Sequence, residues 1–241
     1  MSSEMRKKKV LEIVIREHMD RALPVGSNYV SRIMGLSSAT IRNIMGELED
    51  EGYLEQPHTS AGRIPTERAY RHYVNSLLDT WEGSIHEIRR INRELFMRFQ
   101  KYNELVERTS YVISRLTGYT SFVIYPSDHI YLDGAFHMLE QPEFSEIGRI
   151  KKILRMLDEK ERMLEVINAY LSTGALKIHI GRENSLDGFE GCSIVTSSYS
   201  VRGKVVGGLG IIGPIRMQYR RVVPLVKYIS ESVSRVLDNN L

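Results

Sequence analysis

The chain has 241 residues, a formal net charge of +3, 42% hydrophobic residues and 26% charged residues. These proportions are ordinary for a globular protein in water, and the length is sufficient for two domains. The single cysteine, Cys192, excludes an internal disulfide framework and a zinc site built from several cysteines.

No segment of the sequence has the pattern of a membrane span or of an export signal. The apolar runs are all shorter than the about 20 residues that a bilayer-spanning helix needs, and the first residues lack a signal-peptide core. We therefore expect a cytoplasmic protein that does not associate with membranes. The seven histidines are dispersed and none forms an H-x-x-x-H pair, so we predict no metal site.

Residues 27–50 predict two short helices joined by a tight turn. Ser27 is the expected N-cap of the first helix, whose apolar positions are Tyr29, Val30 and Ile33, and Gly35 is suited to end it. Ser37 or Ser38 then caps a second helix. Its inward residues recur at spacings of three and four, and they are Ile41, Ile44, Met45 and Leu48.

The opposite face of the second helix carries the residue types that read base edges. Arg42 and Asn43 lie there with Ala39, and Thr40 and Gly46 lie on its flank. An arginine binds guanine through two hydrogen bonds, an asparagine binds adenine in the same way, and a small methyl group contacts thymine. The pattern therefore predicts a helix-turn-helix whose second helix enters the major groove of DNA.

A wing is predicted after Gly52. Residues 53–56 form a strand, residues 57–63 form a polar loop tipped by the flexible Gly62 and the cation of Arg63, and Ile64 and Pro65 lead back. Such a loop can place Arg63 along a phosphate strand or in a minor groove, whereas the alternative is that Arg63 and His58 are solvated loop residues. The predicted DNA-binding residues are Ser27, Ser37, Ser38, Thr40, Arg42, Asn43, His58, Thr59, Ser60, Gly62 and Arg63.

Helices on either side complete the first domain. One is expected from Ser3 to Arg21, beginning with the cations of residues 6–9, and another is capped by Thr66 and runs to about residue 79. The cations either approach phosphates or form a solvated face. The acidic residues at positions 47, 49, 50 and 51 end the reading helix and are expected to lie away from DNA. The domain therefore spans residues 1–80.

A long linking helix is predicted for residues 81–117, because residues 85–116 contain neither proline nor glycine and follow a seven-residue repeat. The pattern continues at Val106, Thr109, Ile113 and Leu116. Two alternatives fit it, a coiled-coil seam between two copies or packing of the helix on its own sheet. The predicted dimer seam consists of Ile85, Ile88, Asn92, Leu95, Phe99 and Tyr102.

The remaining residues, 118–241, predict an α+β domain with a largely antiparallel sheet. Strands are expected at residues 119–125, 176–180, 192–199 and 204–212, with a hairpin turn at Arg202-Gly203 and helices after Pro142 and from about residue 217 to 237. Residues 208–213 match the dinucleotide-binding glycine pattern, but Pro214 follows and no β-α-β unit surrounds them. Cys192 lies in a predicted strand after Gly191, and no histidine stands near it in the sequence, so we expect a buried inert thiol. We also expect no cofactor, no catalytic residues and no enzymatic activity.

Several segments resemble the HrcA family of bacterial heat-shock repressors. In the first domain they are PVGS at 24–27, ATIRN at 39–43 and GYLEQPHTSAGRIPT at 52–66; farther on they are LDGAFHMLEQPEF at 132–144 and GIIGPIRMQYRRVVPLVKYIS at 210–230. The resemblance implies a homodimer that represses chaperone operons at an inverted-repeat operator on double-stranded DNA, modulated by the chaperonin GroEL. It also implies that residues 118–241 form a GAF-like regulatory and dimerisation domain.

The chain departs from the family pattern in the reading helix and in its length. Members usually have proline where Ser38 stands and an acidic residue where Ile44 stands, and Gly46 replaces a better helix former at a cost of about 1 kcal/mol. The dimerisation domain that members generally carry as an insertion has no counterpart here. We therefore assign the dimer contact to the long helix and the carboxy-terminal domain. The alternative functions are a ligand-gated regulator that senses a small molecule in its carboxy-terminal domain, and an adaptor whose winged helix binds protein.

Overall fold

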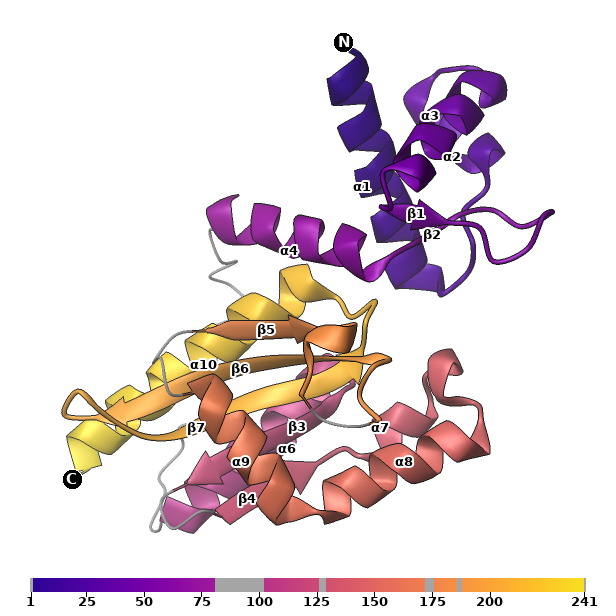
Figure 1. Cartoon of the computed structure of the whole chain (residues 1–241). Helices are drawn as coiled ribbons and strands as arrows, with labels where there is room; N and C mark the ends of the chain where they lie inside the picture. Colours follow the sequence, from indigo (N-terminus) through magenta and orange to yellow (C-terminus); the bar gives the residue numbers. More distant parts are fainter. Residues whose placement is uncertain (1, 81–101, 126–128, 172–175, 186–187, 241) are drawn as a thin grey trace. The chain divides into compact units, whose positions relative to one another are not determined.

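The computed structural model describes residues 2–80, 102–125, 129–171, 176–185 and 188–240. The chain divides into two compact units, residues 1–81 and residues 82–241 (Figure 1). Each unit has its own secondary structure and its own buried side chains. None of the described helices is both long enough and apolar enough to cross a membrane.

The first unit is a winged helix, as the sequence predicted. Helices α1 (Ser3–Arg21), α2 (Ser27–Met34) and α3 (Ser38–Asp50) precede a two-stranded antiparallel hairpin, β1 (Leu54–Glu55) and β2 (Ile64–Pro65), and helix α4 (Glu67–Thr80) follows. The strands pair Leu54 with Pro65 and Glu55 with Ile64, which makes residues 56–63 the loop of the wing. The first helix begins at the predicted residue because the Ser2 hydroxyl accepts a hydrogen bond from the backbone N–H of Met5.

Two details of α2 correct the sequence-based predictions. Gly26, not Ser27, is the N-cap, since Ser27 is already the first helical residue. Ile33 is 51% exposed, whereas Val30 is fully buried. A helix of eight residues has room for one inward ridge, and that ridge passes through Val30 and its i+4 neighbour Met34, which is partly buried.

The second unit is built on a five-stranded antiparallel sheet with the order β4-β3-β7-β6-β5. Its fold is α+β with a largely antiparallel sheet, as we expected. Its elements are α6 (Tyr102–Thr117), β3 (Thr120–Tyr125), β4 (His129–Asp133), α7 (Phe136–Leu139), the 3-10 turn η1 (Pro142–Phe144), α8 (Ile147–Asp158), α9 (Lys160–Leu171), β5 (Lys177–Ile180), the 3-10 turn η2 (Gly181–Glu183), β6 (Cys192–Val201), β7 (Lys204–Pro214) and α10 (Tyr219–Asn240).

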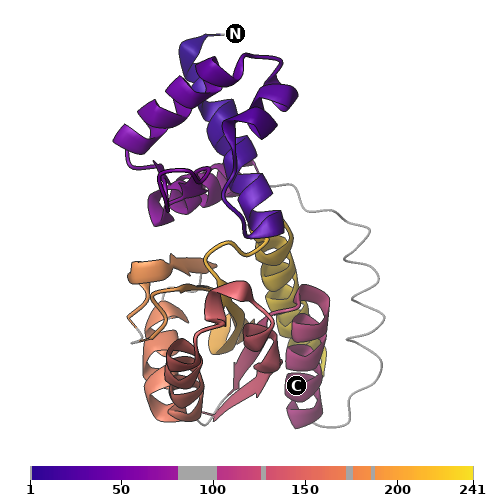
Figure 2. The same ribbon diagram turned by 90° about the vertical axis from the view of Figure 1, so that its right-hand side faces the viewer.

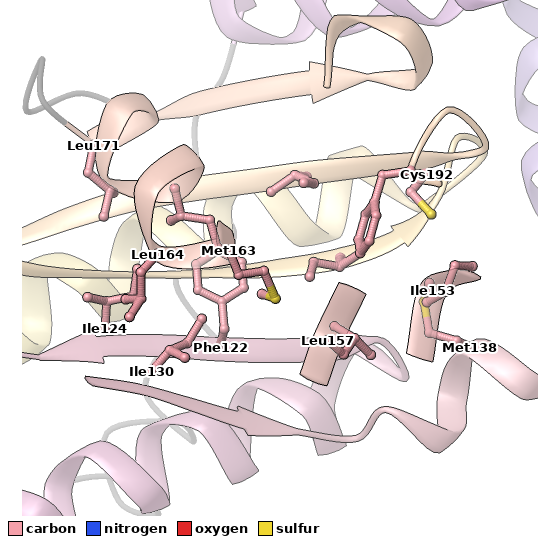
Figure 3. Close-up of a cluster of buried hydrophobic side chains, with 14 of the residues drawn as sticks. Phe122, Ile124, Ile130, Met138, Ile153, Leu157, Met163, Leu164, Leu171 and Cys192 are labelled. Carbon is pink, nitrogen blue, oxygen red and sulfur yellow. The ribbon is translucent and has the colours of Figure 1, made fainter. Parts of the chain in front are cut away.

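Helices cover both faces of this sheet. Figure 2 shows α6 and α10 together against one face and the helices α8 and α9 against the other. The face toward α9 is apolar, because Phe122 and Ile194 of the sheet are fully buried in one cluster with Met163 of α9. Figure 3 shows Phe122 and Met163 in this cluster. The face toward α6 and α10 also buries apolar side chains, among them Val123, Val195 and Ile211, and it contains buried hydroxyl pairs in addition. They join Ser110 to Ser121, Ser193 to Tyr219 and Ser197 to Ser230 at 2.7–2.8 Å.

The glycine-rich run of residues 208–213 lies inside strand β7, as the sequence reading favoured. A Cβ atom on Gly208 would lie 2.1 Å from a methyl carbon of Leu171, and one on Gly210 would lie 2.6 Å from the ring of Phe122. These glycines therefore make room for core side chains. Cys192 begins strand β6 and is fully buried, which confirms the predicted buried thiol.

Helix α6 resolves part of the ambiguity in the seven-residue repeat. Val106, Thr109 and Ile113 are at most 4% exposed, and the helix that carries them packs on β3. This part of the pattern therefore serves intramolecular packing. Of the predicted seam, Ile85, Ile88, Asn92, Leu95 and Phe99 lie outside the described residues, and only the backbone of Tyr102, at the start of α6, is described.

Strand β4 was not predicted, and it joins β3 in a hairpin. Tyr125 pairs with His129, so only residues 126–128 separate the two strands. The segment that follows contacts the connection between β7 and α10, because Arg216 forms an ion pair with Glu143 and donates to the side-chain oxygen of Gln141 at 3.0 Å. Two of the segments that carry the family resemblance, 132–144 and 210–230, therefore form one structural unit.

Candidate nucleic-acid interface

Helix α3 presents the predicted reading residues on its outward face. Ile41, Met45 and Leu48 point into the core, whereas Arg42 and Asn43 are exposed. Within the described residues, no hydrogen bond or ion pair engages the side chain of Arg42 or of Asn43. Both are thus available to an external partner.

Hydroxyl groups order the amino-terminal end of α3. Ser37 is its N-cap, since its Oγ accepts from the backbone N–H of Thr40 at 3.1 Å and lies 2.8 Å from the Thr40 hydroxyl. The Oγ atoms of Ser27 and Ser38 are 2.9 Å apart and join α2 to α3. The predicted phosphate-contacting serines therefore gather where the N–H groups of a helix end favour an anion.

Cations from three other elements hold the opposite end of α3. Lys7 of α1 binds Glu47 at 3.0 Å and Glu51 at 2.7 Å. These two carboxylates raise the pKa of Lys7 above its usual range, through the hydrogen bond to Glu51 first and then that to Glu47. Arg68 of α4 donates to the backbone carbonyl of Glu51 at 2.9 Å.

Arg63 is the third of these cations, and its position differs from the one expected. Its Nε lies 2.8 Å from a carboxylate oxygen of Glu49, and its side chain is only 18% exposed. The backbone explains the position, because Arg63 and Val25 exchange two hydrogen bonds of 2.8 and 2.9 Å. Arg63 therefore lies at the base of the wing, next to α3, and not at its tip.

The wing loop is held in shape by its own residues. The side-chain amide of Gln56 donates to the carbonyls of Thr59 and Ala61, each at 2.9 Å. The backbone N–H of Ala61 donates to the carbonyl of His58 at 2.8 Å. These bonds leave His58, Thr59 and Ser60 exposed at the tip. The loop therefore presents polar side chains on an ordered backbone.

Gly62 allows the wing to pack against the bend before α2. A Cβ atom at this position would lie 2.4 Å from the carbonyl oxygen of Val25 and 2.8 Å from the backbone nitrogen of Gly26. Both neighbours are backbone atoms that a rotamer change cannot move. Gly62 therefore supports the interface through the shape of the wing.

The structure thus brings the predicted residues of α3 and the wing into one small domain. The sequence reading did not identify Lys7 and Glu49 as anchors of α3, or Gln56 as the residue that shapes the wing. Lys7 and Glu51 are 44 positions apart, so no local pattern could pair them. For Gln56, the local signal was an amide side chain next to a short polar loop, because such a side chain can donate to backbone carbonyls of the loop.

Comparisons with known proteins agree on one family. The family model described as "HrcA protein C terminal domain" matches residues 126–223. The heat-inducible transcription repressor HrcA of Ruminiclostridium cellulolyticum is 30% identical over 342 residues, covering 97% of this chain and 98% of the relative. The repressor of the same name from Pelotomaculum thermopropionicum is 28% identical over 340 residues, with 99% and 98% covered.

These alignments also bear on the length of the chain. The first extends over 342 residues although this chain has 241, so roughly 100 positions of the relative lie opposite gaps in this chain. Among solved structures, a crystal structure of a hypothetical protein has a TM-score of 0.83, covers 98% of this chain and 99% of its own, and is 17% identical. That structural likeness supports the fold described above for this chain.

Proposed function

Because this chain belongs to the HrcA family of heat-inducible transcription repressors, we propose that it represses heat-shock operons by placing α3 in the major groove of operator DNA. The observation that carries the proposal is the pair of exposed side chains, Arg42 and Asn43, on a helix that is anchored at both ends. Arg42 would bind guanine and Asn43 adenine, each through two hydrogen bonds. The protein then acts by binding and needs no catalytic group.

Phosphate contacts would come from the elements beside α3. Ser27, Ser37, Ser38 and Thr40 lie at the amino-terminal end of α3, where backbone N–H groups and hydroxyls suit a phosphate oxygen. The exposed wing residues His58, Thr59 and Ser60 would follow the adjacent backbone strand. Arg63, whose Nε is bound to Glu49 at the base of the wing, would add positive charge beside the backbone strand that the wing follows.

The family membership supports three further parts of the proposal. The repressor would act in the cytoplasm as a homodimer on an inverted repeat, because two reading helices must reach half-sites about 34 Å apart. Without the inserted domain, the dimer contact would come from the segment of residues 85–102 and the second unit. The chaperonin GroEL would modulate the active repressor.

Two substitutions test the assignment of roles on DNA. Arg42→Ala should weaken operator binding by about 1–3 kcal/mol and relax preference at the base it contacts. Arg63→Ala should weaken binding to all sequences by a similar factor, because a phosphate-proximal cation carries no base information. Titration of operator and mutated operators by fluorescence anisotropy measures both effects. An equal loss of specificity in the two variants would contradict the assignment.

A further inference from the structure

Helices α7 and α8 of the second unit expose large apolar side chains. Phe136 and Leu139 of α7 and Ile147 and Leu154 of α8 are all exposed, Ile147 to 70%. They are four of the nine large apolar side chains that are exposed among the described residues, and all four lie within residues 136–154. A group of this kind, unlike a single exposed apolar residue, is typical of a surface that binds another protein.

Helix α8 has apolar residues on two sides. On the inner side, Ile153 and Leu157 are buried in the cluster shown in Figure 3. On the outer side, Ile147 and Leu154 are separated by about two helical turns, so they lie in one row along the helix. Ile150 lies between them and is only partly buried. These three residues, Ile147, Ile150 and Leu154, form the outer ridge of α8.

Helix α7 belongs to the same region of the surface. Both α7 and α8 contact the 3-10 turn η1. On their inner sides, Met138 of α7 and Ile153 of α8 are buried in the same cluster. The exposed residues of α7, Phe136 and Leu139, therefore extend the apolar surface that the outer ridge begins.

The charges beside the outer ridge indicate which partner fits it. Glu146, at the amino-terminal end of α8, is exposed, and so are Lys151 and Arg155 in the turns that follow. Within the described residues, no hydrogen bond or ion pair engages the side chain of Glu146 or of Arg155. A partner with one sign of charge, such as an acidic peptide or an anionic lipid surface, would be repelled at one end of the ridge.

A second copy of α8 in antiparallel orientation matches both ends. A two-fold axis across the middle of the helix places Ile147 opposite the partner's Leu154, and Glu146 opposite the partner's Arg155. Each of these contacts then occurs twice. The apolar residues meet apolar residues, and each charge meets its opposite.

We propose that the outer ridge of α8, together with Phe136 and Leu139, is the surface through which the second unit binds a second copy of this chain. This inference rests on the proposed function, which needs two reading helices on one operator, and it names the part of the second unit that makes the contact. Such a contact takes over the role of the dimerisation domain that has no counterpart here.

Sedimentation velocity of the full chain over a concentration series tests the charge contact. Glu146→Arg and Arg155→Glu should each raise the dissociation constant of the dimer at least about 10-fold, because each brings like charges together at two symmetric places. The double variant exchanges the two charges and should restore the dissociation constant to within about 3-fold of the unchanged chain.

A second variant tests the apolar contact. Ile147→Asp should raise the dissociation constant at least about 100-fold, because it buries two carboxylates in an apolar contact. Its thermal midpoint should stay close to that of the unchanged chain, because position 147 is exposed in the single copy. Leu23→Asp is the matched control, since Leu23 is 62% exposed but lies in the first unit, and it should leave the dissociation constant unchanged.

The possible outcomes separate this inference from the proposed function. If the chain forms a dimer that Glu146→Arg, Arg155→Glu and Ile147→Asp do not weaken, the inference is wrong while the proposed dimeric repressor stands. A double variant that stays as weak as the single variants also overturns the inference, because α8 would then not face α8 of the second copy. A chain that is monomeric at micromolar concentration and binds a half-site as tightly as the intact repeat would overturn both.

Discussion

Gly62→Ala should destabilise the winged-helix unit because the wing packs against backbone atoms at this position. The added Cβ would lie 2.4 Å from the carbonyl oxygen of Val25, about 1 Å closer than ordinary contact between such atoms. The neighbouring pair of hydrogen bonds between Val25 and Arg63 must then open. Each contributes about 1 kcal/mol, so we expect a loss of about 2–3 kcal/mol in the free energy of unfolding.

Calorimetry and hydrogen exchange of the full chain measure this effect. The transition of the first unit should fall by roughly 8–20 °C, and the amides of Val25 and Arg63 should exchange faster. Gly46→Ala, in open space in the same unit, is the control and should shift the transition upward. If Gly62→Ala changes the midpoint by less than about 2 °C, the close approach of the wing to Val25 does not exist in solution.

Three further substitutions test other contacts. Arg216→Met should lower the free energy of unfolding of the second unit by about 2–3 kcal/mol in urea denaturation, because it leaves Glu143 without its cation. Adding Glu143→Gln to this variant should restore part of the loss, because it removes the unpaired charge. Lys7→Met should reduce the thermal midpoint of the first unit slightly, and high salt should abolish the difference because it screens the ion pairs in the unchanged protein. Burial raises the pKa of Tyr119 in the folded protein. As the pH rises, the phenol of the unfolded chain therefore ionises first, near pH 10, while the folded protein keeps it neutral. The free energy of unfolding falls as the pH rises further. Tyr119→Phe should therefore be less sensitive to alkaline pH in urea titrations at pH 9 and pH 11, and an unchanged slope would show that Tyr119 is not buried.

Local patterns predicted the elements that have a clear apolar period. The reading helix has four inward residues at regular spacing, and its N-cap, Ser37, was one of the two serines proposed. The long strands β6 and β7 were found because their turn, Arg202-Gly203, has the chemistry of a two-residue hairpin; both residues have positive φ values. These signals lie within a few residues of one another.

Features that depend on distant residues were missed. Strand β4 is short and lies at the edge of the sheet. It is a strand because it pairs with β3, and the sequence HIYLD alone does not indicate this pairing. The seven-residue repeat in α6 was equally compatible with a dimer seam and with a sheet, and only the tertiary structure shows that Val106 and Ile113 face the sheet. Arg63 was expected at the wing tip because its pairing with Glu49 has no local signal.

In the proposed function, two copies of this chain place their α3 helices on an inverted repeat. Fluorescence anisotropy at two salt concentrations, with an inverted-repeat operator of the HrcA type, one half-site and a scrambled duplex, measures whether they do. We predict tight binding to the intact repeat that weakens with salt, and much weaker binding to the half-site and the scrambled sequence. Equal affinity for all three duplexes would contradict the claim, because the reading helix would then bind DNA without sequence preference and without a dimer.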